Sequence, residues 1–343
     1  MKSSRLLPAF VLGILAAATY LPSEAQQGRS IGPGTSGRTV SAPPRTPWGH
    51  PDLQGLWTNV MYGVPFERPP RFGTRELLND EEFAKRREEG ELGAQDDGPR
   101  RGIGAGPEHW YEWWTRVSRR TSLIVDPPDG KLPPLTKEGE IMPVVAGSYG
   151  AGPYNGPEDF HTADRCITRG LPGEMIPTAY NNAYLILQTP THVAIKYEML
   201  LGTRIIPLDG RSHIGGGIRQ WHGDARGRWE GNTLVIEVTN FSDKTKGTLP
   251  MNANSGSPAI SKRAYTGTGA ATLLVERFTR IDAEAMRYEA TVTDPTIYTK
   301  PWTFAVDLRK DDRYRMFEYA CHEGNHAIRN SLSGSRAQER GGR

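Results

Sequence analysis

The stretch TLLVERFTRIDAEAMRYEATVTD, residues 272–294, decides the fold of this chain. It contains two runs rich in β-branched and aromatic residues, and Asp282-Ala283-Glu284 between them has the polar character of a turn. Such runs favour strands, and a short polar connection favours antiparallel neighbours. The stretch therefore predicts two adjacent antiparallel strands.

Similar runs follow one another through the second half of the chain. The eight runs are AYLILQT (183–189), HVAIKYEM (192–199), TRIIP (203–207), TLVIEVTN (233–240), TLLVERFTRI (272–281), MRYEATVTD (286–294), WTFAVDLR (302–309) and YRMFEYA (314–320). Turn residues bound them, and no long helical pattern intervenes. Because a meander of this size usually curls until its edges meet, we predict a mainly β protein built on an antiparallel barrel.

Two short motifs favour a lipocalin-like, calycin-type barrel. Gly55-Leu56-Trp57 resembles the Gly-x-Trp that opens the lipocalin barrel. Trp229-Glu230-Gly231 precedes a strand, as a tryptophan-bearing turn often does in such barrels.

A long, partly helical insertion is predicted at about 61–180. NDEEFAKRREEG, residues 79–90, has the signature of a capped surface helix, with Asn79 and Glu82 in capping-box positions and Gly90 at its end. A second helix is predicted over 108–120. One face of this helix is aromatic and consists of Trp110, Trp113 and Trp114. In one interpretation this face packs the helix against the barrel. In the other the helix is a lid whose aromatic face stacks on a ring-shaped or apolar ligand.

The ends of the chain predict export. Lys2 and Arg5 precede an apolar run and the small-x-small pattern Ser23-Glu24-Ala25, which is typical of a secretory signal peptide cut near Ala25. No later segment approaches the roughly 20 apolar residues that span a bilayer. We expect a periplasmic or secreted protein without a membrane span. Its expected parts are a signal peptide (1–25), a flexible tether (26–48), one barrel domain (49–334) and a disordered tail (335–343).

The charge balance argues against a nucleic-acid partner. Lys and Arg number 42 against 39 Asp and Glu, and the basic residues are scattered along the chain. Two cysteines, Cys166 and Cys321, are present. In an oxidising compartment such a pair more often forms one disulfide than two buried thiols.

Four strands carry a glutamate at mid-run: Glu198, Glu237, Glu276 and Glu318. Alternation places each on the same face as its second neighbours, which for Glu276 are Leu274 and Phe278. In one interpretation the four lie on the solvent face. In the other they line the barrel interior as ligand-binding groups, where a carboxylate must be paired; the candidate partners are Arg204, Arg219 and Arg277.

Two further clusters carry candidate catalytic groups. In IRQWHGDARGRWEGNT, residues 218–233, Arg219, His222 and Asp224 lie close together in a glycine-rich loop, and Trp221 is a candidate ligand contact. A histidine with a nearby carboxylate is a common general base, although Asp224 could instead bind backbone amides in a structural turn.

In FEYACHEGNHAIRN, residues 317–330, His322 and His326 are four apart with Glu323 beside them. Gly324 favours a turn there, and no third metal ligand is marked by spacing, so we predict no metal site.

The chain resembles a family of exported soil-bacterial proteins whose activities are largely uncharacterised. The matching segments are PDLQGLW, RRTSLIVDPPDGKLPPLT, DRCITRG, YNNAYLILQTP, EMLLGTRIIPLDGR, IRQWHGDARGRWEGNTLVIEVTNF, VERFTRIDAEAMRYEATVTDP and YACHEGN. The resemblance implies that Cys166 and Cys321 pair with each other. It departs at His222 and His326, where the family pattern has a methionine and an aromatic residue, and this weakens roles for them shared with the family. The residues that match are His322, Glu323, Asp224, Arg219 and Arg165.

These residues predict an exported, cofactor-independent enzyme that performs acid/base chemistry on a small apolar or aromatic molecule, as a lyase, isomerase or hydratase. His322 is the expected acid/base, oriented by Glu323 or Asp224, with Arg165 or Arg219 stabilising oxyanion charge. The alternatives are a carrier of a hydrophobic ligand, a metal-dependent enzyme using His322, Glu323 and His326, and a structural envelope protein.

Overall fold

A computed structural model describes residues 42–59, 64–95, 117–143, 145, 152–178, 180–245 and 267–341. The predicted signal peptide and most of the tether lie outside these residues, as do Trp110, Trp113 and Trp114. Within the described ranges, no helix has both the length and the apolar character needed to cross a membrane.

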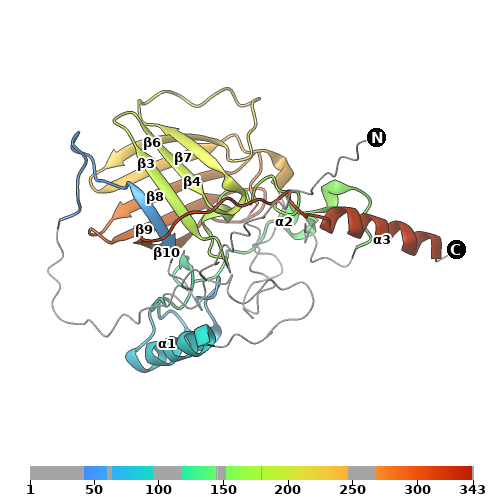
Figure 1. The fold of residues 1–343 in the computed structure, drawn as a ribbon, viewed down its shortest axis with the longest axis horizontal. Helices are drawn as coiled ribbons and strands as arrows, with labels where there is room; N and C mark the ends of the chain where they lie inside the picture. The colour runs from blue at the N-terminus through green and yellow to red at the C-terminus, as the bar shows by residue number, and fades with distance from the viewer. Residues whose placement is uncertain are drawn as a thin grey trace, which may run out of the picture. The chain divides into compact units, whose positions relative to one another are not determined.

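The described residues form an antiparallel barrel, which confirms the predicted fold class (Figure 1). Its strands are β1 (Gly55–Asn59), β3 (Ala183–Gln188), β4 (His192–Tyr197), β5 (Thr203–Pro207), β6 (Asp224–Glu230), β7 (Thr233–Thr239), β8 (Leu273–Arg280), β9 (Ala285–Thr293) and β10 (Trp302–Lys310). A short strand, β2 (Ile124–Asp126), also pairs with β10. The strands follow one another in chain order around the barrel, and β10 pairs back onto β1.

The barrel has one seam, between β5 and β6, where no ladder joins the strands. Every pairing around the rest of the circle is antiparallel, so the odd number of strands leaves β5 and β6 running in the same direction. Side chains close the seam instead. A Cβ on Gly227 of β6 would lie 2.6 Å from Leu208 and 2.9 Å from Ile206, so this close approach requires glycine.

Alternation along the strands fills the barrel with apolar side chains. On β8, Leu274, Glu276, Phe278 and Arg280 are buried and the residues between them are partly exposed. The core around them includes Trp57, Trp302, Tyr288, Phe304, Ile236 and Ile195. The interior is therefore packed, with a few charged groups set among aromatic rings.

The Gly-x-Trp motif closes the barrel end at which β1 begins. Gly55 has φ +120°, and a Cβ there would lie 2.7 Å from Lys310 Cε. Trp57 is fully buried and donates its indole N–H to the carbonyl of Leu53 at 2.9 Å. The Arg280 guanidinium lies 4.4 Å from the ring centroid, a cation–π contact.

The insertion is partly helical in its described residues. They contain α1 (Asp80–Gln95) and α2 (Lys137–Ile141), with the 3-10 turns η1 (Pro70–Phe72), η4 (Pro157–Asp159) and η5 (Gly173–Met175). Asn79 caps α1 as predicted, since Glu82 N donates to Asn79 Oδ1 at 2.8 Å and Asn79 N donates to Glu82 Oε2 at 3.0 Å. The helix continues past Gly90 to Gln95. Residues 117–120, at the end of the second predicted helix, are not helical.

Three further local predictions differ from the structure. The run 314–320 forms no strand and belongs to an irregular segment, 311–326, which we call the strap. Residues 224–230, predicted as part of a loop, form β6, because one face of this arginine-rich stretch packs Ala225 and Gly227 inward. The tail predicted from 335 is helical as far as Gly341, in α3 (Ala327–Gly341), which Ser335 fixes by accepting a hydrogen bond from Tyr154 N.

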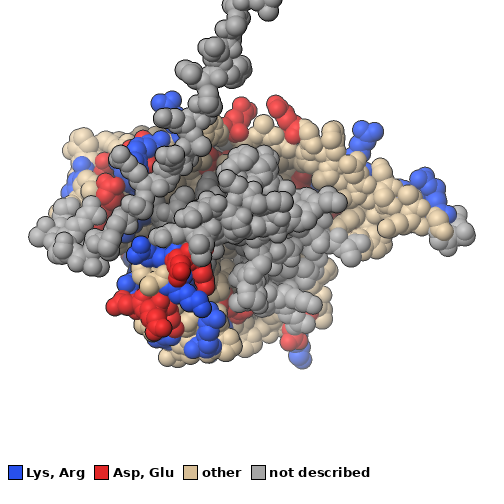
Figure 2. Space-filling view, turned by 60° about the horizontal axis from the view of Figure 1, so that its bottom comes forward, with Lys and Arg blue, Asp and Glu red and all other residues tan. Residues whose placement is uncertain are grey.

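Two further 3-10 turns, η6 (Met199–Leu201) and η7 (Asp243–Thr245), follow β4 and β7. Among the described residues visible in Figure 2, basic and acidic side chains are interspersed.

Candidate functional site

A buried ion pair lies inside the barrel. Arg204 on β5 donates two hydrogen bonds to Glu276 on β8, Nη1 to Oε2 at 2.6 Å and Nη2 to Oε1 at 3.0 Å. Tyr288 on β9 donates its hydroxyl to Glu276 Oε1 at 2.9 Å. All three side chains are almost completely buried. Of the two interpretations of Glu276, its burial in the barrel corresponds to the interior one, and of the three candidate arginines Arg204 is its partner.

The surroundings of this pair keep the Arg204 guanidinium charged. Burial opposes the charge of Arg204, but Glu276 outweighs burial and raises the pKa of the guanidinium. Burial raises the pKa of Tyr288 well above its ordinary value, and Glu276 adds to the effect, so this hydroxyl stays protonated and donates. The pair is thus a fixed dipole inside the barrel.

Tyr197, the last residue of β4, lies beside the pair. Its ring centroid is 5.8 Å from the Arg204 guanidinium carbon. Its hydroxyl is buried and has no hydrogen-bond partner among the described residues. Burial raises the pKa of Tyr197; Arg204 opposes this shift, while Glu276 and Glu174 reinforce it. The hydroxyl is therefore a neutral donor over the whole physiological pH range.

A second polar group adjoins Tyr197 and is carried by the loop 160–178. Thr168 Oγ1 donates to Glu174 Oε1 at 3.0 Å, and the backbone N–H of Arg169 donates to the same oxygen at 3.0 Å. The other oxygen of Glu174 is buried without a partner among the described residues. His222 Nε2 lies 2.9 Å from Thr168 Oγ1 and 3.5 Å from Glu174 Oε1.

The hydrogen-bond directions in this group follow from counting protons. Thr168 has one hydroxyl proton and gives it to Glu174, and its oxygen already accepts the N–H of Gly170 at 2.8 Å. His222 Nε2 must therefore carry the proton that it shares with Thr168. The result is a directed relay from His222 through Thr168 to Glu174.

Packing joins the relay to Tyr197. The rings of His222 and Tyr197 have centroids 6.1 Å apart. Both rings border Gly202, where a Cβ would lie 3.0 Å from His222 Cε1 and 3.5 Å from Tyr197 Cδ2. Tyr184 stands edge-on to Tyr197 at 5.9 Å. His222 keeps 19 % of its side chain exposed while Glu174 is fully buried, so the relay connects solvent with the interior.

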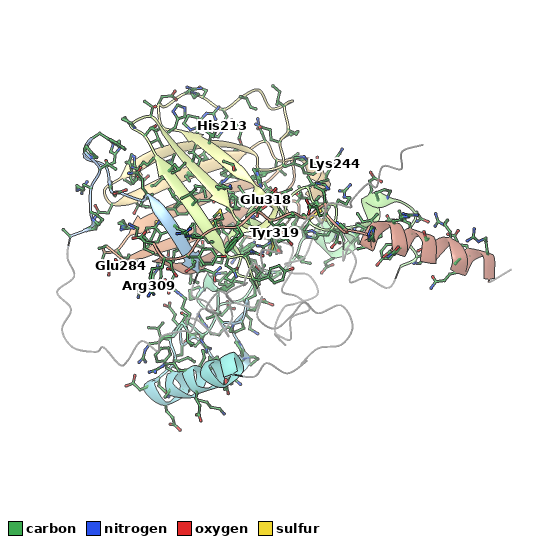
Figure 3. All side chains as sticks on the ribbon, in the orientation of Figure 1. His213, Lys244, Glu284, Arg309, Glu318 and Tyr319 are labelled. Carbon is green, nitrogen blue, oxygen red and sulfur yellow. A yellow bond between two sulfur atoms is a disulfide. The ribbon has the colours of Figure 1, made fainter. Side chains whose placement is uncertain are left out.

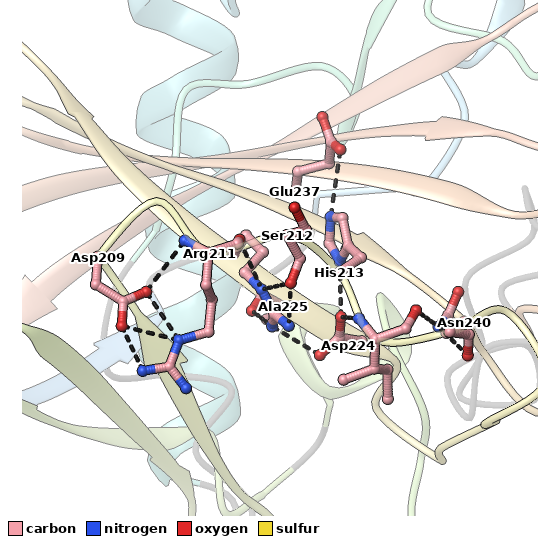
Figure 4. A network of polar contacts seen from close by, with 11 residues as sticks. Asp209, Arg211, Ser212, His213, Asp224, Ala225, Glu237 and Asn240 are labelled. Atoms are coloured by element: carbon pink, nitrogen blue, oxygen red, sulfur yellow. Dashed lines mark hydrogen bonds and ion pairs between the residues drawn. The ribbon is translucent and has the colours of Figure 1, made fainter.

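A different polar network lies on the outer face of β6 and β7 (Figure 4). Asp224 Oδ2 accepts from His213 Nδ1 at 2.8 Å and from the N–H of Ile214 at 3.0 Å, and Oδ1 accepts from Arg226 Nη1 at 2.7 Å. His213 Nε2 lies 3.3 Å from Glu237 Oε1. Burial alone would raise the pKa of Asp224, but these hydrogen bonds outweigh burial and lower it. Asp224 has a histidine partner as expected, but that partner is His213, whereas His222 belongs to the relay.

The predicted glutamates do not converge on one cavity. Glu276 lies inside the barrel, whereas Glu198 is buried against the strap and accepts hydrogen bonds from the Tyr314 hydroxyl at 2.6 Å and the Phe317 N–H at 3.3 Å. Glu237 is partly exposed at 44 %, and Glu318 is exposed on the strap (Figure 3).

The remaining candidates lie at the surface or near it. His322, Glu323 and His326 are exposed on the turn after Cys321 and at the start of α3. Arg219 is exposed and bonds the carbonyl of Ala270 at 3.3 Å, and Trp221 is half-buried.

Arg165 lies 3.8 Å from Glu158. Among the described residues, no three histidine, cysteine, aspartate or glutamate side chains gather closely enough to hold a metal. The histidine that pairs with Asp224 is His213, whereas His322 is exposed on the turn after Cys321. The catalytic role of His322 stays a prediction.

The disulfide between Cys166 and Cys321 is present. It fastens the strap to the loop that carries Thr168 and Glu174. Asn325 strengthens the junction by donating to the carbonyl of Asp164 at 2.9 Å.

Comparison with known proteins gives no name to this site: no family model matches the chain, and no curated protein or solved structure matches it. Glu174, Thr168, Tyr197 and His213 were not identified from the sequence. Glu174 offered one signal, because it is a lone carboxylate in the apolar stretch Leu171–Ile176.

Proposed function

We propose that this chain is an exported, cofactor-independent enzyme that moves a proton on a small apolar or aromatic molecule, as an isomerase, lyase or hydratase. The observation that carries the proposal is the relay from His222 through Thr168 to Oε1 of Glu174, together with the second oxygen of the same carboxylate, Oε2, which is buried with no partner among the described residues. Such an oxygen, held by its neighbour, is a positioned base.

Each member of the cluster has a distinct role. Glu174 Oε2 takes the proton from the substrate, because Oε1 is held by Thr168 and Arg169. Tyr197 donates a hydrogen bond to the oxygen on which charge develops. His222 exchanges protons with solvent and is linked to Glu174 through Thr168.

The ion pair of Arg204 and Glu276 helps to fix the ring of Tyr197, because the Arg204 guanidinium packs against it. The position of His222 departs from the family pattern, so in relatives the proton would reach Glu174 by another route. This assignment gives Glu174 the acid/base role that sequence reasoning gave to His322.

Export is part of the proposal. The signal-peptide pattern with its cut near Ala25 and the disulfide together support a periplasmic or secreted protein.

The proposal is tested by solvent exchange. The purified protein is incubated in D₂O with a panel of small cyclic and aromatic ketones and alcohols, and deuterium incorporation is followed by proton NMR. The wild type should accelerate exchange of at least one compound, and Glu174→Gln should lower that rate about 10²- to 10⁴-fold.

Glu318→Gln is the matched control, because its carboxylate is exposed, and it should exchange at the wild-type rate. A compound that binds tightly to the wild type without any accelerated exchange would indicate the carrier alternative and overturn the enzyme proposal.

A further inference from the structure

The first inference concerns the substrate of the proposed site and rests on the proposed function. We infer that the substrate is an electrically neutral, enolisable carbonyl compound. Tyr197 would recognise its carbonyl oxygen, and Glu174 would remove a proton from the neighbouring carbon.

The charges of the cluster argue for a neutral substrate. Its two carboxylates, Glu174 and Glu276, are matched by two buried guanidiniums, Arg204 and Arg169. Arg204 bonds Glu276 directly, while Arg169 interacts electrostatically with Glu174 and donates to the carbonyl of Ile176 at 2.9 Å. A charged ligand would upset this balance inside the protein, where an unpaired charge costs several kcal/mol.

Two buried polar groups without hydrogen-bond partners in the described part of the chain, one donor and one acceptor, argue for a substrate with a carbonyl oxygen next to an acidic C–H or O–H. Tyr197 offers one O–H donor and Glu174 offers one acceptor oxygen, and neither has a partner among the described residues. The neighbouring rings of Tyr184 and His222 favour a flat or cyclic molecule.

The chemical step balances without a co-reactant. The C–H bond beside the carbonyl breaks, its electron pair forms the enolate double bond, and the proton passes to Glu174 Oε2. Tyr197 stabilises the enolate oxygen through its hydrogen bond. In a substrate with a β,γ double bond the enolate is a conjugated dienolate, and Glu174 returns the proton to its γ carbon, which makes the reaction a 1,3-proton shift.

Phenols test the recognition because a phenol is a stable likeness of an enol. Binding of 4-nitrophenol and of 4-nitrobenzoate is measured by isothermal titration calorimetry. The neutral form of the phenol should bind at least tenfold more tightly than the benzoate anion, and Tyr197→Phe should weaken phenol binding about tenfold.

Tyr314→Phe is the control, since this hydroxyl serves the strap, and it should leave phenol binding unchanged. Tighter binding of the benzoate, or equal binding by Tyr197→Phe, overturns this inference even if solvent exchange is observed. Phenol binding by Tyr197 without exchange of any ketone leaves the recognition intact and overturns the proposed function.

The second inference rests on a different part of the molecule and does not depend on the proposed function. The geometry points to His213 as a pH-sensitive latch that holds the connection 208–223 against β6 and β7. This connection joins the two strands of the seam, and its backbone is paired near its two ends, by Leu208 with Thr191 and by the bridge of Gln220 to Phe241, so side chains hold the part between them.

Side chains of β6 and the end of β7 hold the connection. Arg226 donates to the carbonyls of Arg211 and Ser212, and Asn240 donates to the carbonyl of Ile214 at 3.0 Å. His213 adds the titratable contact, because its two ring nitrogens face two carboxylates, Asp224 and Glu237.

Protonation decides how many of these contacts are hydrogen bonds. The imidazolium form donates from both nitrogens, whereas the neutral ring donates from one and turns a lone pair toward the other carboxylate. The contact with Asp224 is shorter and more buried, so the contact with Glu237 is lost first. Arg226 is the charged group nearest to this triad, and it bonds Asp224.

The direction of the pH effect follows from the protonation state of His213 that makes more hydrogen bonds. Two carboxylates face the ring, and each accepts a hydrogen bond only from a ring nitrogen that carries a proton, so the latch is closed when both nitrogens are protonated and loosens with rising pH when one proton is lost. At the acid limit Asp224, whose pKa is lowered, must be protonated before its own contacts fail.

Hydrogen exchange tests the latch. The amides of 208–216 are followed by mass spectrometry at pH 5.5 and 8.0, with exchange times scaled for the intrinsic pH dependence. The wild type should show at least threefold lower protection at pH 8.0 than at pH 5.5, and His213→Gln should abolish this difference.

His192→Gln is the matched control, because among the described residues the ring of His192 is hydrogen-bonded to Thr191 and to no carboxylate, and the variant should leave the pH difference intact. Glu237→Gln should reduce the difference, since it removes the second carboxylate. Equal protection of 208–216 at both pH values in the wild type, or an unchanged difference in His213→Gln, overturns the latch.

Discussion

Two histidine–carboxylate sites flank the seam of this barrel, and they differ in how fully the carboxylate is used. Asp224, on the outer face, accepts hydrogen bonds on both oxygens, from His213, Ile214 and Arg226. Glu174, at the inner site, is more deeply buried but keeps one oxygen without a partner among the described residues. A saturated carboxylate holds structure together, and an unsaturated buried one is available for chemistry.

The largest expected effect comes from separating the inner site from the strap. The double variant Cys166→Ser/Cys321→Ser opens a loop with a sequence separation of 155 residues. In the chain-entropy model this costs about 5 kcal/mol of unfolding free energy. Guanidinium denaturation of both forms measures the loss. The wild type treated with reductant should match the variant; a loss below 1 kcal/mol would show that the strap is held mainly by Glu198 and Asn325.

Replacing the saturated carboxylate should have the next largest effect. Both oxygens of Asp224 accept hydrogen bonds. In Asp224→Asn the amide NH₂ group replaces one of these oxygens in either orientation, so it faces an N–H donor and that hydrogen bond is lost. We expect a loss of about 3 kcal/mol, typical of buried hydrogen bonds to charged groups. Urea denaturation at pH 7 measures it.

The same variant has a pH signature. The pKa of Asp224 is lowered in the folded state, so the stability it contributes is present above the ordinary aspartate value and is lost as the pH falls through the folded value. The gap between wild type and Asp224→Asn should therefore narrow below about pH 4. A constant gap down to pH 2 would contradict this assignment.

The seam can be disturbed without touching either carboxylate. Gly227→Ala places a methyl group 2.6 Å from Leu208, the first residue of the connection, and should cost about 2 kcal/mol through overpacking. Gly216→Ala is the control on the same connection, because no atom lies within 4 Å of its added methyl. Thermal unfolding of the two variants should differ by several degrees, and equal melting temperatures would show that the seam is loosely packed.

The sequence predicted the barrel because the fold depends on alternation, a local property of strands. Alternation left Glu276 open between the solvent face and the interior with three candidate arginine partners, and the folded path of the chain selects Arg204. The sequence identified Asp224 but assigned the wrong histidine. His213 reaches Asp224 only because an odd number of strands forces the connection 208–223 back over β6, and nothing in the spacing of residues encodes that path. The strap was predicted as a strand because its residues are apolar and aromatic, yet the ladder it would need is already occupied by the pairing of β10 with β1.

The smallest effect on stability should come from the unsaturated carboxylate. In Glu174→Gln the amide oxygen can still accept from Thr168 and Arg169, and the NH₂ group takes the side that has no partner among the described residues. The free energy of unfolding should change by less than about 1 kcal/mol, against about 3 kcal/mol for Asp224→Asn. Parallel urea denaturation of the two variants makes the comparison, and equal losses would mean that Glu174 is as saturated as Asp224. The difference between these two losses of unfolding free energy distinguishes a carboxylate that stabilises the fold, Asp224, from one that is available for reaction, Glu174. A group retained for reactivity contributes little to the stability of the fold that holds it.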